Sequence, residues 1–213
     1  MGLYYREKFK NGAEIAVWEI TEKEPELAKK CVLPNDEQEE LEYITNPQRR
    51  LERLAVRALL DILFPEKVYL RYHDNGRPYL GNSIVELSIA HTKRFVCVLT
   101  HPSLSVGVDM ESLTRNFDSV EARALHTGEL DFLSEREEVR NHQLAILWCA
   151  KEAMFKYMSV NDVDFQKQII AERFTPREEG DLEVCFIDKE GEEDWFDMAY
   201  FTLDDHVIVY VVA

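Results

Sequence analysis

The segment WCAKEAMFKYM, residues 148–158, carries three charged side chains on a helix that otherwise suits a protein core. On a helical wheel, the apolar residues of this region form one stripe roughly 120° wide, and Lys151 falls in its middle. Glu152 and Lys156 lie along one edge of the stripe, where they could simply form a surface ion pair. A buried ammonium needs a partner, because an unpaired charge in an apolar environment is strongly destabilising. An anion must therefore lie near Lys151, supplied by the protein or by a ligand such as phosphate.

Asp109 and Glu111 alternate in the segment VGVDMES, which has the pattern of a strand. On a strand they share one face, with Cα atoms roughly 6.5–7 Å apart, while the apolar residues point the other way into the core. Taken alone, such a pair is typical of a solvent-facing strand edge. Together with Glu152, however, the two acids offer the oxygen ligands that a hard cation such as Mg²⁺ prefers. This cation would also contact phosphate oxygens, and Lys151 and Lys156 would neutralise the same phosphates.

A second group of residues has the chemistry to bind anions. His91 lies eighteen residues before Asp109, a spacing that lets neighbouring strands bring both to one end of a sheet. Arg77 lies on the shoulder of a predicted hairpin, and Arg49 stands at the start of a helix, whose N-terminal end favours anions. Each of the three is also compatible with a purely structural or surface role.

These residues require a scaffold in which strands and helices alternate. The order of predicted elements indicates an α+β chain with two halves, residues 1–104 and 105–213, between which no sequence repeat is apparent. A long helix is expected to end at Pro65, and an Asn-Gly turn predicts the hairpin that follows it. The predicted helices are 36–64, 118–133 and 136–158, and the predicted β segments are 14–20, 67–80, 84–100, 103–112, 182–191, 194–203 and 206–213.

Composition limits the function classes. With 46% hydrophobic residues and 11% aromatic residues, the chain can bury a sizeable core. The formal net charge of −16 argues against binding to nucleic acid or to an anionic membrane, although a local basic pocket could still bind an anionic small molecule. The four cysteines are far apart and form no CxxC pair, which predicts free thiols in a reducing compartment. No apolar leader or long apolar run is present, so we expect a cytoplasmic protein.

Two motifs together resemble those of the 4′-phosphopantetheinyl transferase superfamily. GVDMES is similar to the family's G-[IV]-D-x-E, and WCAKEAMFK, about 37 residues later, is similar to its W-x-x-K-E-[AS]-x-x-K. The upstream elements NGRPYL and IAHT correspond to further family elements. The closer resemblance is to the long, surfactin-synthetase-activating (Sfp-like) type. It implies two similar α/β subdomains in a pseudo-twofold arrangement, with mainly antiparallel sheets, packed helices and an active site in the cleft between them.

The resemblance also implies a reaction. The 4′-phosphopantetheine arm of coenzyme A would pass, with Mg²⁺, to a serine of an acyl or peptidyl carrier protein, releasing adenosine 3′,5′-bisphosphate. Asp109, Glu111 and Glu152 match the family's metal-binding acids, and Glu152 is also the candidate for activating the serine.

Five residues match or lie near positions that contact coenzyme A in the family. Lys156 matches the lysine that contacts the pyrophosphate, and Lys151 is its neighbour in the motif. His91 matches a histidine on a coenzyme A phosphate and is counted with Glu152 and Lys156 as catalytic. Arg77 replaces a motif lysine, and Arg49 lies near a phosphate-contacting position.

Departures from the family pattern keep two alternatives open. Ala90 and Thr92 flank the histidine where the family has serines, and the acidic PNDEQEE stands where lysines are expected. A relative that binds coenzyme A or a carrier protein without catalysis would suit these changes. A Mg²⁺-dependent nucleotide phosphohydrolase would use the same acids. Because two similar halves supply an internal interface, we expect a monomer.

Overall fold

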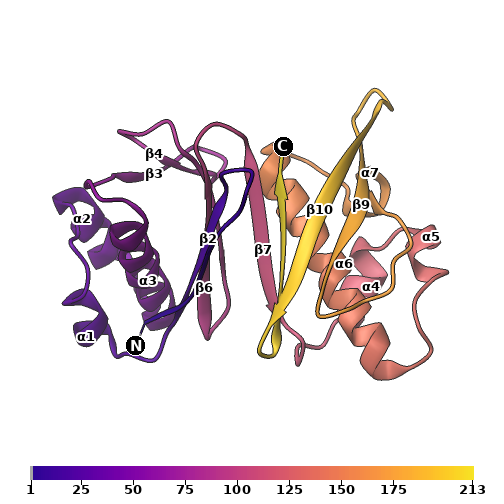
Figure 1. The fold of residues 1–213 in the computed structure, drawn as a ribbon, viewed down its shortest axis with the longest axis horizontal. Helices are drawn as coiled ribbons and strands as arrows, with labels where there is room; N and C mark the ends of the chain where they lie inside the picture. The colour runs from indigo at the N-terminus through magenta and orange to yellow at the C-terminus, as the bar shows by residue number, and fades with distance from the viewer. Residues whose placement is uncertain (1) are drawn as a thin grey trace. The chain divides into compact units, whose positions relative to one another are not determined.

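The protein, described here as a computed structural model of residues 2–213, consists of two compact units. The first ends at Ser105 and the second comprises Val106–Ala213, whereas the sequence analysis placed the boundary between residues 104 and 105. Each unit has its own sheet and helices (Figure 1). Every pair of neighbouring strands runs antiparallel within the described residues, which confirms the predicted α+β fold class.

The first unit has a four-stranded sheet and three helices. In the order of the sheet its strands are β1 (Leu3–Lys8), β2 (Glu14–Glu19), β6 (Phe95–His101) and β5 (Glu86–His91). The helices are α1 (Glu24–Ala28), α2 (Asn35–Tyr43) and α3 (Pro47–Leu63), and a separate hairpin pairs β3 (Leu70–Tyr72) with β4 (Pro78–Leu80). In α3 the apolar positions repeat at helical spacing, and Leu54 and Leu59 share a buried core with Val96 and Val98 of β6.

The single helix predicted over residues 36–64 is wrong, because the structure divides it into α2 and α3. Asn46 ends the connection by capping α3, and its side-chain oxygen accepts hydrogen bonds from the backbone N–H groups of Gln48 and Arg49. Pro47 occupies the first helical position, where the missing N–H costs nothing. An Asn-Pro pair therefore starts a new helix here, and it places Arg49 in the first turn of α3.

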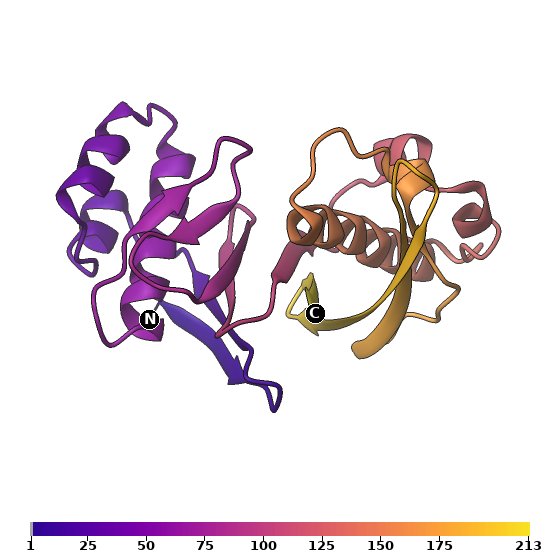
Figure 2. The same ribbon diagram turned by 90° about the horizontal axis from the view of Figure 1, so that it is seen from above.

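The second unit has a five-stranded sheet and four helices. In the order of the sheet its strands are β7 (Val106–Ser112), β11 (His206–Val212), β10 (Glu193–Leu203), β9 (Glu179–Ile187) and β8 (Ile169–Ala171). The helices are α4 (Asp118–Ala124), α5 (Thr127–Leu130), α6 (Glu137–Met158) and α7 (Phe165–Gln168). The long helix α6 lies along one face of this sheet, against β7 and β11 (Figures 1 and 2).

The strand face that carries Asp109 and Glu111 is turned towards α6. A Cβ atom at Gly107, two residues before Asp109, would lie 2.1 Å from the main-chain oxygen of Ala153 in α6. Since alternate residues share a face, the two acids lie on this helix-covered side. Val209, the partner of Asp109 on β11, belongs to the same buried core as α6. The reading of these acids as a solvent-facing strand edge is therefore excluded.

We expect Gly107→Ala to destabilise the protein by about 3 kcal/mol, near the upper end for overpacking, because the opposing atom belongs to the backbone of α6. Chemical denaturation measures this loss. Gly81→Ala is the matched control, since the nearest atom to its added Cβ belongs to the flexible side chain of Arg71, at 3.4 Å, and the main-chain oxygen of Tyr69 lies at an ordinary contact distance of 3.7 Å. Equal free energies of unfolding for the two variants would contradict the close packing of β7 on α6.

All four cysteines are free, as the sequence predicted. Across residues 2–213, none of the helices combines the length and the apolar character needed to cross a membrane.

Candidate active site

Lys156 connects helix α6 to strand β7. Its ammonium donates hydrogen bonds to Asp109 Oδ1 at 2.7 Å and to the main-chain oxygen of Val108 at 2.9 Å. The ammonium is 29% exposed at side-chain level and the carboxylate 11%, so the ion pair is only partly screened by water. Glu152 stands one helical turn before Lys156 and faces the same strand. The two motifs of the sequence therefore meet in the second unit.

Glu152 is a half-buried carboxylate with an altered proton affinity. Burial raises the pKa of Glu152, and the nearby negative charge of Asp109 raises it further. The positive charges of Lys156 and Arg115 act in the opposite direction. Such mutual influence requires these groups to lie close together, so Asp109 and Glu152 form one acidic cluster with two basic neighbours.

Arg115 is a member of this cluster that the sequence analysis missed. Its guanidinium pairs with Glu111, and it lies over the rings of Phe117 and Trp148, at 5.4 and 5.5 Å from their centroids. A basic residue in the loop directly after an acid-bearing strand was the available signal. Arg115 thus holds Glu111 near the acidic cluster and neutralises part of its charge.

The donor set of the cluster fits a hard divalent cation. Asp109 Oδ2 is buried and has no hydrogen-bond partner with acceptable geometry among the described residues. The thiol of Cys149 lies close to this carboxylate, and its pKa is raised well above the ordinary value, first by burial and then by the charge of Asp109. Carboxylate oxygens suit Mg²⁺, whereas a protonated thiol is a poor ligand for it.

Two of the three acids are paired with basic side chains. Within residues 2–213, no three His, Cys, Asp or Glu side chains are arranged so that they could hold a metal. Asp109 and Glu111 instead pair with Lys156 and Arg115. The assignment of Asp109, Glu111 and Glu152 as metal ligands therefore stays a prediction.

Lys151 points away from this cluster and into the core of the second unit. Its ammonium and the carboxylate of Glu129 are both fully buried, with Nζ 2.9 Å from Oε2. The ammonium also donates hydrogen bonds to the main-chain oxygens of Phe165 and Ile169. Its three N–H groups are thus used by the protein, and none is left for a phosphate. The anion expected beside Lys151 is Glu129, so we remove Lys151 from the proposed coenzyme A contacts.

Glu129 joins several elements of the second unit around this ion pair. Its Oε1 accepts a hydrogen bond from the backbone N–H of Ala171, and its Oε2 accepts one from the backbone N–H of His126. Burial lowers the pKa of Lys151, while the adjacent Glu129 favours its charged form. The pair therefore ties α5, α6 and β8 together. Glu129 carries no motif or spacing in the sequence that marks it as the partner of Lys151.

Of the three candidate anion-binding residues of the first unit, two are in contact and the third lies apart. Arg49 and His91 are in contact, with Nη1 of Arg49 2.7 Å from Nε2 of His91. Arg77 instead pairs with Glu86 at 2.9 Å. Glu86 and His91 are the two ends of β5, about 16 Å apart along the strand. Arg77 is therefore held at the opposite end of this strand from the other two.

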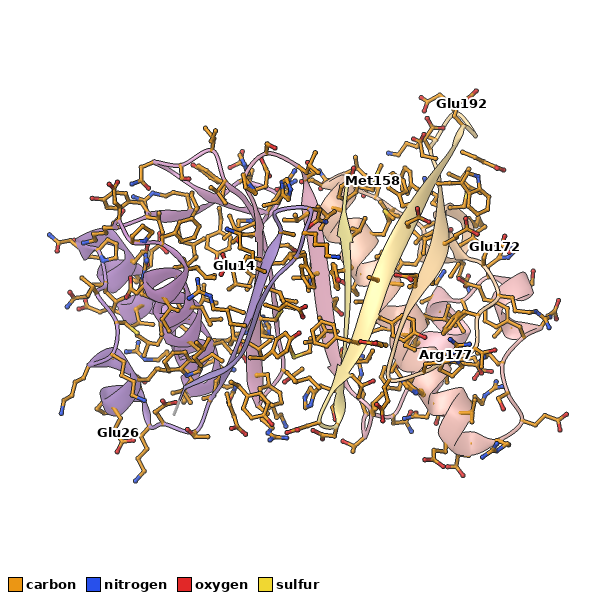
Figure 3. All side chains as sticks on the ribbon, viewed as in Figure 1. Glu14, Glu26, Met158, Glu172, Arg177 and Glu192 are labelled. Atoms are coloured by element: carbon orange, nitrogen blue, oxygen red, sulfur yellow. The ribbon has the colours of Figure 1, made fainter. Side chains whose placement is uncertain are left out.

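Figure 3 shows the side chains on the ribbon, with Met158 labelled at the end of α6. The helix ends there because Ser159 adopts a left-handed conformation, and the N–H of Ser159 bonds back to the main-chain oxygen of Phe155. Lys156 therefore stands in the last turn, where the helix dipole favours a positive charge.

A comparison with protein families identifies the superfamily of the second unit. Residues 105–211, half of the chain, match the model of the 4′-phosphopantetheinyl transferase superfamily. This range includes the acidic cluster and Lys156 but not the anion-binding residues of the first unit. A search of curated proteins gives no match.

Proposed function

Because this chain belongs to the 4′-phosphopantetheinyl transferase superfamily, we propose that it transfers phosphopantetheine from coenzyme A to a carrier protein. The acceptor would be a serine of an acyl or peptidyl carrier protein, and the other product would be adenosine 3′,5′-bisphosphate. The contact of Lys156 with Asp109, beside Glu152, is the observation that supports this most strongly, since it joins both motifs inside the matched range.

The proposed reaction breaks the pyrophosphate link of coenzyme A. The serine Oγ attacks the phosphorus that carries the pantetheine arm, a new P–O bond forms, and the bond to the bridging oxygen breaks. The serine proton passes to Glu152, directly or through water, and adenosine 3′,5′-bisphosphate leaves with the bond electrons. Its place beside Asp109 and Lys156, in the cluster that joins both motifs, suits Glu152 to this role.

The remaining residues would position and neutralise charge, which is most of what phosphoryl transfer requires. Mg²⁺, when bound by Asp109, Glu111 and Glu152, would withdraw charge from the phosphate oxygens. Lys156 would contact the pyrophosphate from the last turn of α6. For these roles, Asp109 must exchange its ion pair with Lys156 for the cation, and Glu111 must do the same with Arg115.

In the first unit, we propose that Arg49 and His91 bind one phosphate of coenzyme A. Arg77 would contact a different part of the same molecule, since it lies at the other end of β5. A cytoplasmic monomer is the expected form of the protein.

A mass measurement tests the proposed function. Incubating the protein with coenzyme A, Mg²⁺ and an apo-carrier protein should add the mass of phosphopantetheine to the carrier, and chelation of the metal should prevent the gain. Release of phosphate or nucleotide from coenzyme A without a carrier would instead indicate a phosphohydrolase. Binding of coenzyme A in a calorimeter with no turnover on any carrier would indicate a non-catalytic relative.

A further inference from the structure

We propose that Glu52 is a positioning residue that fixes the protonation and orientation of His91 and Arg49 for binding a phosphate group. This inference rests on the proposed function, in which that phosphate belongs to coenzyme A. Glu52 lies on α3, one turn after Arg49, and is almost fully buried. Burying a carboxylate destabilises the folded protein unless the carboxylate is well paired. The partners of Glu52 therefore indicate its role.

The carboxylate of Glu52 contacts both members of the anion-binding pair. Its Oε2 lies 3.3 Å from Nη1 of Arg49 and 3.6 Å from Nδ1 of His91. The same Nη1 of Arg49 lies 2.7 Å from Nε2 of His91. The three side chains, from helix α3 and the end of strand β5, therefore form one connected group.

The direction of these contacts determines where the proton of His91 lies. A guanidinium can only donate hydrogen bonds, so Nε2 of His91 must accept from Arg49. A neutral imidazole that accepts at Nε2 carries its proton on Nδ1, and Nδ1 faces Glu52. The carboxylate favours this proton, as carboxylates behind metal-binding histidines do.

Glu52 is much less exposed to solvent than Arg49 and His91, the two residues proposed to bind the phosphate. The side chains of Arg49 and His91 are 59% and 37% exposed, whereas that of Glu52 is 10% exposed. A phosphate can therefore approach Arg49 and His91 from solvent, with Glu52 behind them. Arg49 can turn to the phosphate, and Nε2 can then take a proton from solvent and donate to the same phosphate. The carboxylate of Glu52 stays beside Nδ1 in both states, and its negative charge stabilises the protonated ring.

The ring of His91 in the full-length protein without ligand provides the first test. Nitrogen chemical shifts at neutral pH should show the tautomer protonated on Nδ1. In Glu52→Gln this preference should weaken, because the neutral amide attracts the Nδ1 proton less while Arg49 still donates to Nε2. The affinity for coenzyme A measured by calorimetry should fall about tenfold, the lower end for loss of an orienting partner. Glu52→Asp should restore part of both.

Glu24→Gln is the matched control. Glu24 lies on α1 and pairs at 2.6 Å with Arg50, which follows Arg49 on α3. Glu24→Gln should change neither the tautomer nor the affinity. An unchanged tautomer in Glu52→Gln, or a changed tautomer with unchanged affinity, would overturn the proposal. If that variant does not fold, a wild-type ring protonated on Nε2 would overturn it equally. The ring measurement needs no turnover, so failure of carrier modification alone would count against the proposed function and not against this assignment.

Discussion

Glu152→Gln should reduce transfer of phosphopantetheine by about 10²–10⁴-fold, the usual contribution of a general base, while the protein stays folded. Glutamine keeps the shape of the side chain but can neither accept the serine proton nor offer a charged oxygen to a cation. The rate of mass gain on a carrier protein measures the effect. Glu138→Gln, an exposed change on the same helix, is the matched control. An unimpaired rate in Glu152→Gln would remove Glu152 from the proposed chemistry.

The same variant has a predictable dependence of stability on pH. Because burial raises the pKa of Glu152, the folded protein binds this proton more tightly than the unfolded chain does. The contribution of Glu152 to wild-type stability therefore falls as pH rises from 4.5, the ordinary pKa of a glutamate, through the raised pKa of the folded state. Glu152→Gln lacks this loss. With metal chelated, the free energy of unfolding of the variant minus that of wild type should increase as pH rises over that range. A difference that does not change with pH would contradict the raised pKa.

Lys151→Met should lower the free energy of unfolding by about 3–5 kcal/mol, the cost of leaving a buried charge without its partner. Glu129 would remain fully buried with no opposite charge, and the main-chain oxygens of Phe165 and Ile169 would lose a donor. Urea denaturation measures the change. A double variant that also carries Glu129→Gln should recover part of the loss, because it removes the stranded charge.

Lys167→Met is the control for this experiment. Lys167 also forms an ion pair, with Asp164 at 2.9 Å, but its side chain is 78% exposed, so the loss should stay within about 1 kcal/mol. Similar losses for both lysines would contradict the buried pair. The folded fraction of Lys151→Met should keep its affinity for coenzyme A, whereas a lysine that contacts phosphate would lose it.

Part of the fold and of the candidate site was predictable from local pattern. The alternation of Asp109 and Glu111 with apolar residues identified strand β7, and helical spacing identified α6 with Glu152 and Lys156 on one edge. These are short-range properties, because strand and helix periods are set by the backbone itself. The break between α2 and α3 was also visible in principle, since Asn46 and Pro47 are local signals for a helix start.

Other features depend on contacts between distant parts of the chain. The partner of Lys151 is Glu129, on a separate short helix, and the partner of His91 is Glu52, on an earlier helix. The sequence around a charged residue does not show which distant residue of opposite charge will lie beside it in the folded protein.

The sequence by itself determined the α+β class, the two motifs and the need for an anion beside Lys151. Only the tertiary structure decided that this anion is a protein carboxylate, that the acids of β7 face α6, and that Arg77 lies apart from Arg49 and His91. The physical reason is that backbone periodicity acts over a few residues, whereas burial and charge pairing are settled by how the helices and strands of each unit pack.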